Sequence, residues 1–555
     1  METFGAFIGI VCELFYARTD LLMELSKIAE ESVRGSFFLV IGTAASTVIG
    51  AVASILVARL LGPSGYGQYS LAFVLPSLFV SFADFGLGAA LTRYSASLRS
   101  QGRNLRLASM MGSAVFFNVV VSSIAFLLMF EFAGPLAATV LQRQNMKELV
   151  AVASIAIVFQ GLVNISSSAF VGLDRMDQSA LTTVVPDSVR VVFSPVLILV
   201  GFGVVGAVAG ELSGWILAGL LGLWLLLVHK RTLRKADSTR ETESGLGQDL
   251  QMMMNYGMAL YLADLLATVL DQYQNIVLAF FTSNTEIGNF SVAANFGALV
   301  GIVSVPVMTA LFPAFSKLDP QTRKKELQEM FQRSVKYTSL LILPTAIFIA
   351  ALSRDLVQVV YGTNYSQAPT YLTLYAGIFL FATLGSYVIS SFLSGIGRTR
   401  EAAKIVIVQL AVFLPIAPVM AWLWRVPGVI AGLLLSVLIS TCFGLWLAIH
   451  KYGMRVNLKD SLAALVTALA SAVPILPLAW YSALPSLTNV LVCATIYLVA
   501  YLTLAPVLKA VKRTDIQTLE LVFGQVRILR SAARMILAYE ERVLVALERG
   551  RSEAA

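Results

Sequence analysis

The amino-acid sequence predicts an all-α polytopic membrane protein with about 14 transmembrane helices. Of its 555 residues, 57% are hydrophobic and only 13% are charged, about half the charged share of an ordinary soluble domain. The mean hydropathy is +0.80, and apolar runs of about 20 residues, long enough to cross a hydrocarbon core, recur along the chain. These runs are continuous and do not alternate with polar residues, which favours helices over the strands of a membrane barrel.

Fourteen apolar runs are candidates for membrane-spanning helices. They lie near residues 36–60, 67–92, 107–133, 149–173, 178–202, 205–228, 252–281, 287–312, 336–360, 367–396, 402–424, 427–449, 460–482 and 488–508. Lysine and arginine concentrate in alternate loops between these runs, which is typical of cytoplasmic loops. We therefore expect a multi-pass protein of the cytoplasmic membrane with both termini cytoplasmic. The net charge of +8 reflects this loop bias and does not indicate a nucleic-acid partner.

An internal repeat divides the predicted spans. GYGQYSLA (65–72) matches EIGNFSVA (286–293), SSAFVGLDR (167–175) matches SSFLSGIGR (390–398), and VVGAVAG (204–210) matches VPGVIAG (426–432), at offsets of 221 to 223 residues. Each copy covers six spans, so both copies have the same orientation in the membrane. Parallel repeats of this kind are typical of transporters in which the substrate path lies between two bundles.

The repeat predicts the organisation of the whole chain. We expect an N-terminal interfacial segment (1–35), a first six-helix bundle (36–228), a cytoplasmic linker (229–251), a second six-helix bundle (252–449), two extra transmembrane helices (450–510) and a cytoplasmic amphipathic tail (511–555).

Two spans carry charges far from their ends. Arg190 lies midway along the fifth span, three residues after Asp187, and Asp264 and Asp271 lie on one face of the seventh span. A charge inside a membrane is costly and usually faces a cavity or a partner. Arg190 can therefore line a cavity or simply pair with Asp187, and the two interpretations are compatible. The two aspartates can line a cavity, hold a helix pair together or carry a coupling ion.

Neutral polar residues are also placed inside spans at helical spacing. An amide can bind a sugar hydroxyl, but it can equally link two helices. Asp84 on the second span can belong to the same polar surface or cap the bend at Gly86 and Gly88. The candidate substrate-binding residues are Arg190, Asn164, Gln160, Asn275 and Asn295, and the candidate cavity or coupling carboxylates are Asp84, Asp187, Asp264 and Asp271.

Several segments resemble the polysaccharide-transporter branch of the multidrug/oligosaccharidyl-lipid/polysaccharide exporter superfamily. They are LVARLLGPSGYGQYSLA, FADFGLGAALTRY, SSAFVGLDRMDQSAL and LDQYQNIVLAFF, and their order and spacing fit the family over roughly residues 36–510. The resemblance implies two six-helix bundles, often with two extra C-terminal helices. It also implies a substrate that is an oligosaccharide linked to polyprenyl phosphate or pyrophosphate, moved from the inner to the outer leaflet.

The sequence therefore predicts a flippase for lipid-linked oligosaccharides that works by alternating access. In this interpretation Arg190 attracts the phosphate, because a guanidinium can hold two phosphate oxygens at once. Two alternatives are a cation-coupled multidrug antiporter of the same superfamily and an intramembrane sugar polymerase or transferase. We expect no catalytic residues, no metal site and no cofactor beyond a coupling H⁺ or Na⁺, since no phosphate-binding GxxxxGK[ST] loop or HExxH motif is present. The expected partners are the lipid-linked oligosaccharide, membrane lipids and glycan-assembly enzymes.

Overall fold

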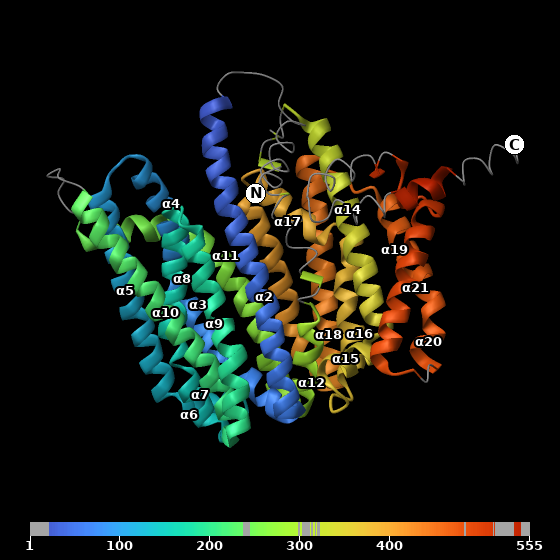
Figure 1. Cartoon of the computed structure of the whole chain (residues 1–555), viewed down its shortest axis with the longest axis horizontal. Coiled ribbons are helices and arrows are strands. Elements are labelled where there is room, and N and C mark those ends of the chain that lie inside the picture. The colour runs from blue at the N-terminus through green and yellow to red at the C-terminus, as the bar shows by residue number, and fades with distance from the viewer. Residues whose placement is uncertain are drawn as a thin grey trace, which may run out of the picture. The chain divides into compact units, whose positions relative to one another are not determined.

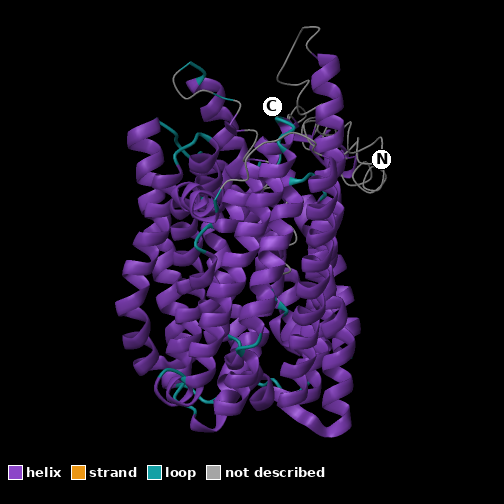
Figure 2. Ribbon diagram, turned by 90° about the vertical axis from the view of Figure 1, so that its left-hand side faces the viewer, coloured by secondary structure: helices purple, strands orange, loops and turns teal. Residues whose placement is uncertain are grey.

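The structure is a computed structural model, and it describes residues 22–236, 245–297, 300–301, 311, 315–316, 318, 322–481, 484–513, 515–516 and 538–545. Residues 1–21 of the predicted interfacial segment, residues 237–244 of the predicted linker and most of the predicted tail lie outside this set. Within it the chain is helical throughout, joined by loops and without a β-strand (Figure 2). The predicted all-α membrane fold class is thereby confirmed.

Residue contacts divide the chain into two units. The N-terminal unit comprises residues 26–291 and 417–429, and the C-terminal unit comprises residues 292–416 and the described residues from 430 onward. The seventh predicted span, in α11 (Leu246–Phe281), packs against α3, α4 and α5 of the N-terminal unit. The division into two six-helix repeats stays a prediction.

The N-terminal unit begins with a helix of 51 residues (Figure 1). Its elements are α2 (Leu22–Ala72), α3 (Val74–Asp84), α4 (Leu87–Ser100), α5 (Asn104–Glu131), α6 (Ala133–Thr139), the 3₁₀ turn η1 (Gln144–Met146), α7 (Lys147–Ala153), α8 (Ala156–Gly172), α9 (Met176–Leu197), the π-helical turn η2 (Ile198–Phe202), α10 (Gly203–Ala236), α11 and the start of α12 (Asn284–Asn295). Leu91, Met110 and Phe170 are fully or almost fully buried in its core, where α4, α5 and α8 meet.

The C-terminal unit is built from the remaining helices. They are α14 (Lys324–Ala351), α15 (Ser353–Tyr361), α16 (Ala368–Ala376), the 3₁₀ turn η3 (Gly377–Leu384), α17 (Ser386–Gly395), most of α18 (Thr399–Tyr452), α19 (Leu458–Ala472), the 3₁₀ turn η4 (Val473–Ile475), α20 (Leu476–Tyr481) and α21 (Ser486–Val507). Phe392 is buried at its centre, with its ring 5.4 Å from that of Phe315 and 5.2 Å from that of Phe331.

Eight described helices are long and apolar enough to cross a membrane, or ten if each of two bent helix pairs forms one span. Their apolar side chains face outward to an extent unusual for a soluble protein: Leu199, Trp422 and Trp480 are each more than two-thirds exposed. The predicted number of 14 spans stays a prediction, and part of the predicted span 287–312 lies outside the described residues.

Three of these helical segments are about twice as long as one crossing requires. Gly42–Asp84 has 43 residues, Met176–Arg234 has 59 and Thr399–Tyr452 has 54, whereas one crossing takes about 20. Each contains a break in the helix, at Gly62 (φ 67°), Gly201 (φ 108°) and Arg425 (φ 51°) respectively. Gly62 and Arg425 lie in predicted loops, and Gly201 lies at the end of the predicted span 178–202. A reversal in one or two residues can therefore replace a loop between spans.

The matching motifs of the repeat meet at a close helix crossing. A Cβ on Gly67 of α2 would lie 1.9 Å from the carbonyl oxygen of Asn284, and a Cβ on Gly288 of α12 would lie 1.9 Å from that of Pro63. Only glycine allows two helix backbones to approach this closely. The motifs GYGQYSLA and EIGNFSVA thus supply the two glycines of one contact.

The turn into α12 is fixed by a capping box beside this crossing. The backbone N–H of Ser283 donates to Glu286 Oε2 at 2.9 Å, and the backbone N–H of Glu286 donates to Ser283 Oγ at 3.3 Å. Arg425 donates to Glu286 Oε1 at 3.3 Å. Burial alone would raise the pKa of Glu286, but the hydrogen bonds from Ser283 and Arg425 outweigh it and lower the pKa.

The segment after α21 is held to α14 by a buried ion pair. Lys336 on α14 pairs with Asp515, and both side chains are less than one-tenth exposed. Tyr337 also donates to Asp515, at 3.3 Å, and Lys512 donates to Asp460 on α19 at 2.8 Å. The described beginning of the predicted tail is therefore part of the C-terminal unit.

We expect Gly67→Ala to destabilise the protein, because the added methyl group would overlap a backbone oxygen that cannot rotate away. Overpacking of this kind costs about 1–3 kcal/mol. Thermal denaturation of the detergent-solubilised protein should show a lower midpoint than the parent. Gly247→Ala is the control, since a Cβ there meets nothing within 4 Å. A Gly67→Ala midpoint equal to that of the control would contradict the close approach of α2 and α12 at Gly67.

We also expect the described helical segment 538–545 to dock more firmly at acidic pH. Burial, together with the nearby Asp515 carboxylate, raises the pKa of Glu540 from 4.5 to about 7. A group with a raised pKa contributes stability that is complete below the ordinary value and is lost as the pH rises through the raised one. Hydrogen exchange in this segment, corrected for intrinsic rates, should therefore quicken between about pH 5 and pH 8. Glu540→Gln should remove that dependence, and an unchanged profile in this variant would contradict it.

Candidate functional site

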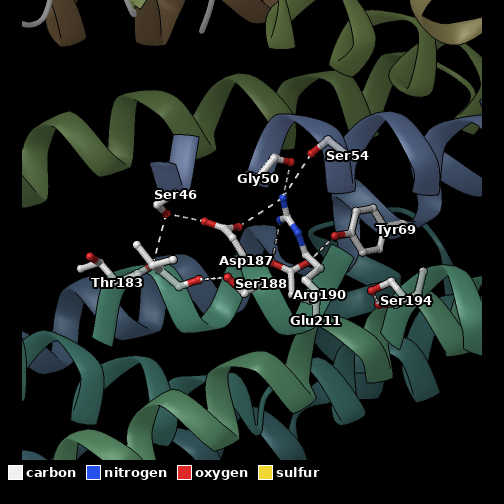
Figure 3. A network of polar contacts seen from close by, with 12 residues as sticks. Ser46, Gly50, Ser54, Tyr69, Thr183, Asp187, Ser188, Arg190, Ser194 and Glu211 are labelled. Carbon is white, nitrogen blue, oxygen red and sulfur yellow. Dashed lines mark hydrogen bonds and ion pairs between the residues drawn. The ribbon is translucent and has the colours of Figure 1, made fainter. Parts of the chain in front are cut away.

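A mostly buried guanidinium lies between α2, α9 and α10 of the N-terminal unit. Arg190 on α9 is 3.4 Å from Asp187 Oδ1, one helical turn earlier, and 3.7 Å from Glu211 Oε1 on α10 (Figure 3). Its Nη2 donates to the Gly50 carbonyl at 2.7 Å and to Ser54 Oγ at 3.4 Å, both on α2. Three helices therefore converge on one cation.

The two carboxylates have further donors of their own. Ser46 on α2 donates to Asp187 Oδ2 at 2.5 Å, and the Tyr69 hydroxyl of α2 donates to Glu211 Oε2. The Tyr69 ring stacks on Tyr66 with centroids 5.8 Å apart. Each carboxylate is thus held by the guanidinium on one side and by a hydroxyl of α2 on the other.

The charges of this cluster do not balance. The side chains of Arg190, Asp187 and Glu211 are 16%, 23% and 13% exposed, so the low dielectric strengthens their attraction. One cation between two ionised carboxylates leaves a net charge of −1. Arg190 Nε is buried and has no hydrogen-bond partner within the described residues. Arg190 Nε can therefore donate to one further acceptor oxygen.

Small residues bring these helices close enough for the cluster to form. On α10, Gly206, Gly210, Gly214, Ala218 and Gly222 recur at every fourth position and so share one face. A Cβ on Gly210 would lie 2.4 Å from Ser194, and one on Gly214 would lie 2.4 Å from the Pro186 carbonyl oxygen of α9. This stripe presses α10 against α9 and so carries Glu211 to Arg190.

A stripe of four polar residues, Asp264, Thr268, Asp271 and Asn275, runs along α11 and is arranged differently from the Arg190 cluster. Thr268 donates to the Asp264 carbonyl at 3.1 Å, and Asn275 donates to the Asp271 carbonyl at 3.3 Å. Both aspartates are exposed, and neither carboxylate forms an ion pair with any described residue. The stripe is therefore polar, and its acidic groups are open to a cation.

Asp84 has the local role that the sequence left open for it. Its Oδ2 accepts the Gly86 backbone N–H at 3.1 Å, and Gly86 has a φ of 74° at the start of α4. Asp84 also lies close enough to Asp264 for their charges to interact. The structure thus brings Asp84 and Asp264 together, separately from the pair formed by Asp187 and Arg190.

The predicted neutral residues are spread over both units. Gln160 and Asn164 lie on one face of α8, Gln160 half-buried and Asn164 exposed, and their amides make no hydrogen bond within the described part of the chain. Asn295 lies in the C-terminal unit, where it donates to the Tyr361 hydroxyl at 3.4 Å. The assignment of these residues to substrate binding stays a prediction.

Glu211 and Tyr69 belong to the cluster but were missed in the sequence. Glu211 carried the same signal as Arg190, since it is an acidic residue inside the predicted span 205–228. Tyr69 lies in GYGQYSLA, where the repeat drew attention to the glycine and the serine. Neither residue is near Arg190 in the chain, and only helix packing brings them together.

A helical membrane protein with a buried charge cluster inside its spans is typical of transporters. The chain belongs to the family of polysaccharide biosynthesis proteins, which matches residues 56–370. The resemblance seen in the sequence to the polysaccharide-transporter branch of the exporter superfamily is thereby confirmed.

Curated relatives and solved structures agree with this family. The lipid II flippase MurJ of Bacillus subtilis (strain 168) is 21% identical, over 81% of this chain and 88% of its own length. A structure of lipid II flippase MurJ in an inward closed conformation has a TM-score of 0.67 at 16% identity and covers 85% of this chain and 100% of that one. An inward-facing multidrug resistance MATE family transporter has a TM-score of 0.61 at 15% identity, over 73% and 94%. What this chain shares with these two solved structures is the fold.

We expect Arg190→Gln to be far more destabilising than Glu211→Gln. The first change leaves two carboxylates buried without a cation, which costs about 3–5 kcal/mol, whereas the second leaves the balanced pair of Arg190 and Asp187. Unfolding of the detergent-solubilised variants by denaturant measures the difference. Arg398→Gln, at an exposed arginine, is the control for loss of a positive charge. Equal losses of unfolding free energy in Arg190→Gln and Glu211→Gln would show that charge balance does not hold the cluster together.

Proposed function

We propose that the protein is a flippase that moves an oligosaccharide linked to polyprenyl phosphate or pyrophosphate from the inner to the outer leaflet by alternating access. The observation that carries this proposal is the buried Arg190, held inside a membrane-spanning helix of a member of the polysaccharide biosynthesis family. Such a substrate must bring phosphate through the membrane, and a guanidinium is the side chain best matched to phosphate oxygens. The relative named a lipid II flippase supports the same function.

In this function Arg190 exchanges partners during the cycle. A phosphate competes with Asp187 and Glu211 for the guanidinium, because all three ligands offer anionic oxygens in the same geometry. A carboxylate that loses the guanidinium is left in a poorly hydrated site without its cation, and a coupling cation can take that place. Phosphate binding and uptake of a coupling H⁺ are then linked at one cluster. Na⁺ is the alternative coupling ion.

The sugars would be recognised by the neutral polar residues. Gln160 and Asn164 on α8 have amides that are free within the described residues, and an amide offers both a donor and an acceptor to a sugar hydroxyl. Asn275 and Asn295 are further candidates. Weak, exchangeable contacts of this kind suit a carrier that has to release its cargo.

The proposed setting follows from the sequence. The basic loops indicate that both termini lie on the cytoplasmic side of the cytoplasmic membrane, where the lipid-linked oligosaccharide would be assembled. Glycan-assembly enzymes are the proposed protein partners. The two parallel six-helix repeats would rock against each other about the glycine crossing of Gly67 and Gly288.

A cation-coupled multidrug antiporter is the second candidate function. Asp264 and Asp271 are exposed and form no ion pair with a described residue, which suits a cationic substrate, and the fold is also that of a multidrug transporter. Arg190 argues against it, because it already engages the carboxylates of Asp187 and Glu211 that a cationic substrate would need. The third alternative, a polymerase or transferase, draws no support from the family or the relatives.

The test is a strain depleted of this protein and complemented with variants. Depletion should trap lipid-linked glycan on the cytoplasmic side and lower surface glycan, while sensitivity to cationic drugs stays unchanged. Unchanged glycans together with increased drug sensitivity would instead assign the antiporter function.

Complementation separates a phosphate-binding Arg190 from a purely structural one. Arg190→Gln should abolish surface glycan. The triple variant Arg190→Gln, Asp187→Asn, Glu211→Gln removes the uncompensated carboxylates and should regain stability, yet it should not regain transport, because no cation remains for the phosphate. Protein amount in the membrane is measured alongside. Full transport by a stable triple variant would mean that Arg190 serves only to balance its two neighbours.

A further inference from the structure

A cavity lies wholly within the C-terminal unit. It has a cavity volume of about 740 Å³, within the range of pockets that hold a single small ligand. Its walls come from α14, α16, η3, α19 and α20. It contains none of the residues of the Arg190 cluster, and the function proposed above does not use it.

Small side chains on facing helices create this cleft. The residues concerned are Ala346, Ala350, Ala351, Ala376, Gly377, Ala472 and Ala479. In a membrane protein such residues normally let helices touch, and α14 does pack against both α16 and α19. Where these helices meet, the small side chains leave a slot lined mainly by apolar groups, which suits a flexible hydrocarbon chain.

The cleft is open at the surface of the unit and apolar at its mouth. Leu469, Leu476 and Trp480 line it and are 50%, 39% and 71% exposed. Tryptophan is enriched where a membrane meets water, because its ring is apolar and its N–H is polar. We therefore expect the mouth at Trp480 to lie near the depth of the lipid headgroups.

One charged side chain lines the cleft among the described residues, and it is a cation. Arg354 follows Ser353 at the start of α15 and is exposed, and no ion pair within the described chain involves it. Its neighbour Asp355 is engaged elsewhere, since Asn489 on α21 donates to Asp355 Oδ2 at 2.7 Å. The hydroxyls of Ser353 and Thr373 bond to each other at 2.9 Å. The rim thus presents one exposed positive charge that is not held in an ion pair with any described residue.

We propose that this cleft is a binding site for an anionic phospholipid of the bilayer, with one acyl chain in the slot and the phosphate on Arg354. An apolar slot beneath a free cation complements a molecule with a hydrocarbon chain and an anionic head. An acyl chain is a better match for this volume than a polyprenyl chain, which is several times longer. The helices α19 and α20 that form one wall lie outside the predicted six-helix repeats, so the site can be occupied without obstructing a path between the repeats.

The experiment uses the purified full-length chain in detergent, titrated with phosphatidylglycerol or with phosphatidylcholine of identical chains. Native mass spectrometry counts the bound lipid. The parent protein should hold one phosphatidylglycerol and prefer it about tenfold, as one charge-assisted hydrogen bond would give. Arg354→Gln should lower phosphatidylglycerol binding to the phosphatidylcholine level. Lys459→Gln, which removes an exposed charge from α19 outside the cleft, should leave the preference intact.

A second variant tests the slot itself. Ala350→Phe places a ring in the cleft and should reduce the binding of both lipids, and Ala479→Phe replaces it if the first variant fails to fold. The proposal is overturned if Arg354→Gln keeps the preference for phosphatidylglycerol, or if a folded cleft variant still binds lipid as the parent does. It is also overturned if polyprenyl phosphate displaces phosphatidylglycerol at equal concentration, because the cleft would then belong to the transported lipid.

Discussion

The absence of water from the membrane interior is the constraint on which the rest of the structure depends. It requires every backbone polar group to bond within its own helix, and it makes a charge costly unless the charge faces a cavity or has a partner. The first requirement explains why the described chain stays helical up to the short breaks at Gly62, Gly201 and Arg425, where it reverses direction. The second explains why Arg190 is enclosed by two carboxylates, a carbonyl and a hydroxyl.

Close helix contacts make that enclosure possible. Apolar side chains gain little by leaving lipid for a protein interior, so helices associate through tight packing and hydrogen bonds. The glycines of α10 allow α9 to approach until Glu211 reaches Arg190, and Gly50 leaves room for Asp187 beside α2. Packing and electrostatics therefore stabilise the same contact. A larger residue at Gly210 or Gly214 would separate the two charges as well as the two helices.

The sequence predicted the features that depend on local pattern. Continuous apolar runs predicted the helical membrane fold, and a charge inside such a run identified Arg190 and its neighbour Asp187, one turn apart. Glu211 lies 21 residues from Arg190, and Tyr69 lies more than 100 residues from both. Their approach depends on the angle and distance between α2, α9 and α10, which a periodic pattern does not contain. At Gly62 and Arg425 the sequence predicted only short loops between two apolar runs. A pattern of apolar runs does not reveal that one or two residues are enough to reverse the helix.

The excess negative charge around Arg190 has a consequence for transport. An unpaired guanidinium in this position would cost about 3–5 kcal/mol, so a phosphate-binding cation benefits from partners that neutralise it before its substrate arrives. In the function we propose, the phosphate replaces a carboxylate, and one anionic contact is exchanged for another. The free energy of that exchange is small because both partners offer similar oxygens in the same low dielectric. A carrier needs such a balance, since a phosphate bound too tightly to Arg190 on one side of the membrane would not leave on the other.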